Sequence, residues 1–215
     1  MKLNKKDLNV YLKRVFIAVL GLFLLGLSAA INIKSNLGSD PITVLYDGAC
    51  EFFNLNIDIA INVINFSLVA IVFLLKKKHV NLGTLVYLLC LGTFVNIGMT
   101  IYDLFSFPYT FISRLVVSFI GCWIAFLGIS LFMTADIGVD PWTAIAKMIS
   151  EKLGKKFGIS RMAIDILALI FGWIMGGTVG IITIFCAVVG GPAIQKICDV
   201  LDNKLGNMLK FDCKN

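Results

Sequence analysis

Charged residues are scarce in this chain of 215 residues. Asp, Glu, Lys and Arg supply only 15% of the sequence, whereas hydrophobic residues supply 59% and the mean hydropathy is +0.92. Soluble domains carry about 25% charged residues, so this scarcity excludes an ordinary soluble protein. The composition indicates a protein whose main solvent is lipid.

Histidine and paired cysteines are also nearly absent. The chain has a single histidine, His79, and its six cysteines show no C-x-x-C spacing. It contains neither an H-E-x-x-H segment nor a P-loop. These absences give no support to a metal site, a dithiol centre or a nucleotide-driven step. We therefore expect no enzyme, no catalytic residue, no cofactor and no metal, and we interpret the cysteines as small packing residues.

Long apolar stretches are what the sequence does contain. They cover residues 15–33, 57–75, 82–102, 115–133, 159–175 and 178–197. Each approaches the roughly 20 residues that a helix needs to cross about 30 Å of hydrocarbon. The stretches are continuously apolar and do not alternate every second residue, which favours helices over a barrel. The fold class predicted is an all-α membrane protein with about six transmembrane helices.

Basic residues are distributed unevenly between the two sides of this six-helix arrangement. With the N-terminus inside, 17 of the 19 Lys and Arg fall in cytoplasmic pieces, leaving Lys34 and Arg114 outside. This asymmetry follows the positive-inside rule and predicts that both termini are cytoplasmic. The net charge of +6 would then meet anionic lipid headgroups, so the partner expected is the lipid bilayer and not a nucleic acid.

The sequence contains an internal repeat. The segment L-G-S-D-P-I-T at 37–43 returns as I-G-V-D-P-W-T at 137–143, an offset of 100 residues. We divide the chain into a basic N-terminus (1–14), membrane repeat 1 (15–105), membrane repeat 2 (113–200) and a C-terminal tail (201–215). Three spans in each repeat force the second copy to insert upside down relative to the first. The sequence thus predicts two inverted three-helix repeats.

The repeated motif has a structural interpretation of its own. Each copy supplies a glycine for a tight turn, an aspartate for an N-cap and a proline for the first helical turn: Gly38, Asp40 and Pro41, then Gly138, Asp140 and Pro141. Short helices are predicted at 41–53 and 141–153. They are too short to span a bilayer, so they are either interfacial or re-entrant.

Six residues are candidates for a substrate or ion pathway: Asp40, Thr43, Asn65, Asp140, Thr143 and Asp165. Two half-helix N-termini facing a central cavity would bring the aspartates to a substrate, although the motif also suits two simple capped connectors. Asp165 would have either a substrate or proton role, or a structural ion pair with Arg161 one turn away. Asn65, like Asn62 and Asn96, is interpreted mainly as an interhelical hydrogen-bonding residue.

Glycines near the end of the chain also have two interpretations. Gly172 and Gly176 form a G-x-x-x-G step, and Gly190 and Gly191 precede Pro192. They indicate either close helix contacts or an unwound segment lining a binding site. Glycine-rich faces would also permit a homodimer.

The doubled G-x-D-P-x-T motif, on a small membrane protein with a basic N-terminal segment, resembles the YczE/YyaS/YitT group of bacterial membrane proteins, most closely its YczE-like branch. The resemblance covers about residues 14–200. It implies a multi-pass protein of the bacterial cytoplasmic membrane, and it implies no biochemical activity. The second copy departs from the first at Trp142, where Ile42 stands, and at Pro192, where Thr93 stands.

Architecture therefore favours a small secondary transporter or permease-like protein for a small molecule or ion. The alternative is a regulatory or scaffolding membrane protein that acts on a partner enzyme or complex. That alternative predicts a filled bundle with no polar cavity, in which Asp40, Asp140 and Asp165 are all satisfied locally.

Overall fold

The computed structural model describes residues 5–76, 82–105, 110–138, 140–154 and 157–209. These ranges contain no strand and form eight helices: α1 (Lys5–Ser35), α2 (Pro41–Phe53), α3 (Ile57–Lys76), α4 (Leu82–Leu104), α5 (Phe111–Thr134), α6 (Pro141–Leu153), α7 (Phe157–Ile174) and α8 (Ile181–Leu209). The predicted all-α class is confirmed. Outside the described residues lie Lys2, Lys77, Lys78, His79, Val139, Lys155, Lys156, Lys210, Cys213 and Lys214.

Five of these helices, α1, α3, α4, α5 and α8, are long and apolar enough to cross a membrane. α7, which carries Arg161 and Asp165 within 18 residues, is not among the five. The predicted stretches at 15–33 and 178–197 differ from α1 and α8 at their ends. Both helices continue into polar sequence beyond the apolar stretch, because hydropathy locates the lipid-contacting part of a helix and not its hydrogen-bonded ends.

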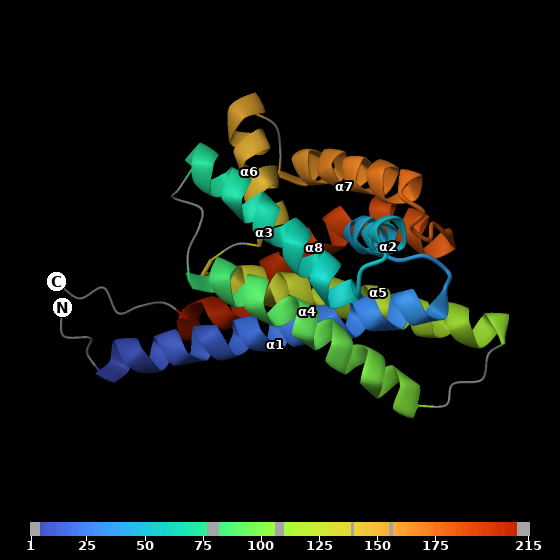
Figure 1. Cartoon of the computed structure of the whole chain (residues 1–215). Helices are drawn as coiled ribbons and strands as arrows, with labels where there is room; N and C mark the ends of the chain where they lie inside the picture. The colour runs from blue at the N-terminus through green and yellow to red at the C-terminus, as the bar shows by residue number, and fades with distance from the viewer. Residues whose placement is uncertain (1–4, 77–81, 106–109, 139, 155–156, 210–215) are drawn as a thin grey trace.

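The helices lie in two layers (Figure 1). The long helices α1, α4, α5 and α8 form one layer, in which α1 packs along both α5 and α4. The other layer contains α2, α3, α6 and α7, with α2 and α6 both packed against α7. The first turns of α1 and the last turns of α8 lie at the same end of the bundle.

α1 and α5 cross through very small residues. A Cβ on Gly21 would lie 2.7 Å from the carbonyl oxygen of Gly128, and a Cβ on Gly128 would lie 2.7 Å from that of Gly21. Farther along, the hydroxyl of Ser28 donates to the carbonyl of Gly121 at 2.7 Å. Close approach of this kind is how helices gain packing energy in lipid. These glycines therefore serve contacts within one chain.

Each of these two helices also binds the end of the other through an arginine. Arg114 donates to the carbonyls of Ser35 (2.6 Å) and Asn36 (3.1 Å), at the C-terminal end of α1. Arg14 donates to the carbonyl of Asp136 (3.3 Å) and forms an ion pair with its carboxylate (3.4 Å), just after α5. Carbonyls at helix C-termini have no intrahelical partner, so the arginines satisfy groups that lipid would leave unpaired.

The loops of the G-x-D-P motif contact the start of a distant helix. The carbonyl of Leu37 accepts from the backbone N–H of Ile182 at 3.4 Å, and that of Ile137 accepts from Gly83 at 3.1 Å. Gly38 has φ +93°, as its predicted turn requires. Gly138 is needed for another reason: a Cβ there would lie 2.9 Å from Gly83 Cα. The predicted turn role thus holds for Gly38, whereas Gly138 permits close packing against α4.

Glycines also bring α2 and α7 together. A Cβ on Gly172 would lie 2.7 Å from backbone atoms of Leu45, and Gly48 faces Gly172 from α2. The close-contact interpretation of the G-x-x-x-G step is therefore confirmed at Gly172. α8 runs without a break through Pro192, so the alternative of an unwound segment there is wrong.

Candidate functional site

The site begins at the N-termini of α2 and α6, which have the predicted bounds. Asp40 and Asp140 are N-caps in extended conformation, each followed by proline in the first turn. The Asp40 carboxylate accepts from Thr43 N (3.1 Å) and from the Thr43 hydroxyl (2.6 Å), and Asp140 accepts from Thr143 N (2.9 Å). The capping role predicted for both aspartates is confirmed.

A buried ion pair lies beside the second of these N-termini. Arg161 Nε donates to Asp165 Oδ1 at 3.1 Å, and its Nη1 donates to the hydroxyl of Thr143 at 3.2 Å. The two charged side chains are only 7% and 15% exposed. The predicted i, i+4 partner of Asp165 is thus present. The charge count places Arg161 with the cytoplasmic residues, at the start of the stretch 159–175, and the structure shows its guanidinium buried because two polar partners within the bundle hold it there.

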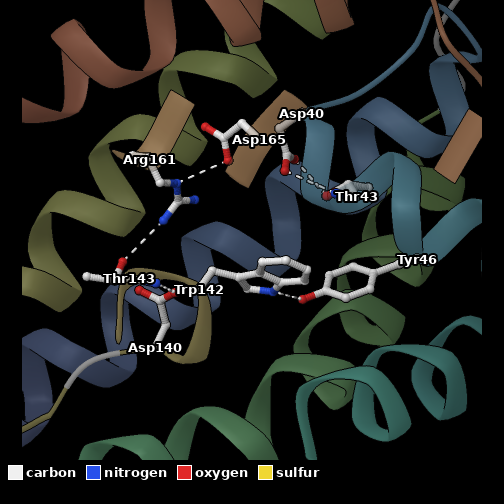
Figure 2. A network of polar contacts seen from close by, with 8 residues as sticks. All are labelled: Asp40, Thr43, Tyr46, Asp140, Trp142, Thr143, Arg161 and Asp165. Atoms are coloured by element: carbon white, nitrogen blue, oxygen red, sulfur yellow. Dashed lines mark hydrogen bonds and ion pairs between the residues drawn. The ribbon is translucent and has the colours of Figure 1, made fainter. Parts of the chain in front are cut away.

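A second polar feature beside these N-termini is a series of hydrogen bonds between three neutral side chains. Tyr46 OH donates to Asn65 Oδ1 at 2.9 Å. It also accepts from Trp142 Nε1 at 3.0 Å, the contact drawn in Figure 2. All three side chains are buried. The series joins α3, α2 and α6, which is the interhelical role expected for Asn65. Asn62 lies against Gly92 of α4, and Asn96 is on the exposed surface.

A cavity lies between the two layers, where these groups meet. The centres of water-sized molecules can occupy about 70 Å³ of it, which is room for several waters. Its polar lining consists of Ser28, Asp40, Thr43, Tyr46, Tyr87, Asp140, Arg161 and Asp165. Apolar side chains from α1, α3, α4, α5 and α8 complete the wall, among them Phe126 and Phe132. The cavity is therefore amphipathic, with its charged groups around the two short-helix N-termini (Figure 2).

Four of the six predicted pathway residues line this cavity: Asp40, Thr43, Asp140 and Asp165. Asn65 and Thr143 lie one hydrogen bond behind the lining, on Tyr46 and Arg161 respectively. Pro41 lines the cavity, and Pro141 is buried in the first turn of α6.

Sequence reasoning missed Tyr46 and Tyr87 and assigned Arg161 only a supporting role. Tyr46 follows Thr43 by three residues on a short helix, so the two share a face, and that spacing could have identified it. Tyr87 lies in a long apolar stretch with no local signal. Within the described ranges, no group of three or more His, Cys, Asp or Glu side chains is placed to hold a metal ion.

An all-helical chain with five membrane-length apolar helices is a multi-pass membrane protein. The chain belongs to a family of unknown function, DUF6198, whose model matches residues 12–199. An "Uncharacterized protein" of Haemophilus influenzae is 26% identical over 189 residues, which cover 88% of this chain and 85% of that protein. The "Uncharacterized membrane protein YczE" of Bacillus subtilis is 23% identical over 176 residues, which cover 81% of this chain and 80% of that protein. The YczE-like resemblance is confirmed, and no solved structure matches.

Proposed function

We propose that this protein is a small secondary transporter or permease-like protein and that its substrate, a small molecule or ion, passes through the central cavity. The observation that carries the proposal is the cavity itself, in which buried charged groups converge where a filled bundle would have only apolar packing. Charged side chains are costly inside a membrane and usually mark a pathway or a binding site.

Matching contacts support an arrangement of two inverted repeats. Leu37 contacts Ile182 and Ile137 contacts Gly83, pairs related by offsets of 100 and 99 residues. Arg14 with Asp136 and Arg114 with Asn36 form a second such set, at an offset of 100. A pseudo-two-fold axis near the crossing of α1 and α5 would produce these reciprocal pairs. In this proposal α7 is the sixth span, and α2 and α6 are re-entrant helices.

The proposed location is the bacterial cytoplasmic membrane, with both termini in the cytoplasm. The distribution of basic residues supports the orientation, and the start of α1 and the end of α8 lie at the same end of the bundle. We propose no enzymatic activity and no nucleic-acid partner. A homodimer within the bilayer remains part of the proposal.

A regulatory or scaffolding role is the second candidate, and one observation favours it. Asp40, Asp140 and Asp165 each have a local partner, as a purely structural role would require. The two candidates differ over access: a transporter opens its cavity to water on both faces of the membrane, whereas a scaffold has no need to.

Native cysteines allow that difference to be measured. Cys186 lines the cavity, whereas Cys198 is buried farther along the same helix and does not line it. We would retain each as the single cysteine and treat whole cells and inverted vesicles with a membrane-impermeant thiol reagent.

Modification of Cys186 from both faces is the result expected for a transporter, with Cys198, which does not line the cavity, protected from the outer face as the matched control. Protection of Cys186 from both faces, in protein that elutes as a folded species, would overturn the transport proposal and favour the scaffold. Ala29→Cys, which tests another lining position on α1, provides an independent second site.

A further inference from the structure

The two short-helix N-termini already have their own anions. An exposed helix N-terminus attracts carboxylates and phosphates, because its first N–H groups and its dipole are positive. Here the Asp40 carboxylate binds the N–H of Thr43, and the Asp140 carboxylate binds that of Thr143. Both positive ends are therefore neutralised before any substrate arrives, which leaves an anionic substrate little to bind there.

The one basic side chain of the lining is also engaged. Arg161, whose side chain is only 7% exposed, donates to Asp165 and to Thr143. Once this ion pair is counted, no basic side chain of the lining balances Asp40 and Asp140, and their two full charges exceed the roughly half charge at each helix N-terminus, which leaves the lining net negative. In a low-dielectric interior, this excess of negative charge attracts cations and repels anions far more strongly than it would in water.

The rest of the lining favours an organic cation. Tyr46, Tyr87, Phe126 and Phe132 border the same cavity, and aromatic faces attract ammonium groups. Apolar walls from Leu25, Leu91 and other side chains would bury a short alkyl group. Among the described side chains, no three of the His, Cys, Asp and Glu types form a cluster here that could hold a transition metal ion.

We infer that the cavity binds a small organic monocation of the alkylammonium type and discriminates against carboxylates of the same size. The inference rests on the proposed function, since it assigns a substrate class to the same cavity. The ammonium group binds among the acidic groups of the lining, which include Asp40 and Asp140, and the alkyl group lies against the aromatic and aliphatic wall.

Trp142 provides a reporter for this inference. Its indole N–H binds Tyr46 OH, and Tyr46 lines the cavity. The chain has three tryptophans, and the other two, Trp123 and Trp173, are exposed on the outer surface. The full-length variant W123F/W173F therefore leaves a single fluorophore one hydrogen bond from the site.

We would titrate this variant, purified in detergent, with methylammonium to butylammonium chloride and with the sodium carboxylates from acetate to valerate. A saturable change in Trp142 emission with at least one ammonium ion, at least about tenfold tighter than with the carboxylate of the same length, is the expected result. Equal responses, a preference for carboxylates, or no response to any ammonium ion would overturn the inference.

Charge-removing variants sharpen the test. Asp40→Asn and Asp140→Asn keep an N-cap side chain but remove the charge, since Asn caps helices about as well as Asp. Each should weaken ammonium binding by about tenfold, whereas Asp103→Asn, which removes a charge outside the cavity, should leave it unchanged.

The two proposals can fail separately. Ammonium binding with Cys186 protected from both faces would retain the cation site and remove the transport function. Cys186 modified from both faces without ammonium selectivity would retain the transport function and overturn the substrate class.

Discussion

The two halves of the molecule place different chemistry at matching positions. Where the second half has Arg161 and Asp165, the first half has Ile61 and Asn65. The first half closes its side of the cavity with a neutral Tyr46–Asn65 hydrogen bond, and the second with a buried ion pair. The backbone framework of caps and helix ends is shared, so the difference lies in the side chains that face the cavity.

A second difference concerns packing. α2 approaches α7 through Gly48 and Gly172, whose counterparts in the other half are Met148 and Val72. A glycine-to-glycine contact lets two backbones touch, whereas methionine and valine hold α6 and α3 apart. α2 therefore packs tightly against α7 of the second half, whereas α6 packs less closely against α3 of the first half.

The largest expected effect comes from making the second half resemble the first at one position only. Arg161→Ile would leave Asp165 buried without its cation, at a cost of about 3–5 kcal/mol in the free energy of unfolding. Thermal or SDS-induced unfolding in detergent would measure it. The double variant R161I/D165N copies both residues of the first half and should recover most of the loss. A single variant as stable as the wild type would show that the ion pair is not buried.

Replacing a contact glycine of the second half by its counterpart in the first half should have the next largest effect on stability. Gly172→Val places the matching residue of the first half where a Cβ meets backbone atoms of Leu45 at 2.7 Å. We expect a loss of about 1–3 kcal/mol, measured by the same unfolding assay. Gly158→Val is the matched control, because a Cβ on Gly158 of the same helix meets nothing within 4 Å. Equal losses in the two variants would refute a specific α2–α7 contact.

Removing the neutral hydrogen bonds of the first half is the third change. Tyr46→Phe leaves the N–H of Trp142 and the Oδ1 of Asn65 without the hydroxyl that pairs both, at a cost of about 1–3 kcal/mol. Unfolding combined with Trp142 emission in the single-tryptophan variant would detect the change. Tyr11→Phe, near the start of α1, should leave both measurements unaltered. An unshifted Trp142 emission in Tyr46→Phe would contradict the observed network.

The smallest effect is expected where the halves are alike. Asp40→Ala and Asp140→Ala each remove an N-cap and should each cost about 0.5–2 kcal/mol. The corresponding Asn variants should retain most of that stability. If only one of the Ala variants were destabilised, the equivalence of the two caps would be disproved.

Local features of the fold were predictable from the sequence. The bounds of α2 and α6 follow from capping signals at both ends of each helix. The D-P pair marks the start, and a residue in left-handed conformation marks the end, Asn54 in one copy and Gly154 in the other. Such signals act within a few residues, and no distant contact is needed to interpret them.

The cavity was predictable only in part. Its aspartates belong to the repeated motif, but Tyr87 enters it because α4 packs beside α1 and α3, a contact between distant segments. The position of Arg161 was also predictable only in part. Its pairing with Asp165 one turn away follows from the sequence, but its hydrogen bond to Thr143, 18 residues earlier on another helix, has no local signal.

The exchange of backbone hydrogen bonds between the motif loops and α4 and α8 has a consequence for synthesis on the ribosome. When only the first half has emerged, the N–H of Gly83 lacks its acceptor, the carbonyl of Ile137, and the carbonyl of Leu37 lacks its donor, the N–H of Ile182. Neither half can complete its own hydrogen bonding alone. These two hydrogen bonds therefore form only once the second half is present, and separately expressed halves should become resistant to proteolysis only when produced together.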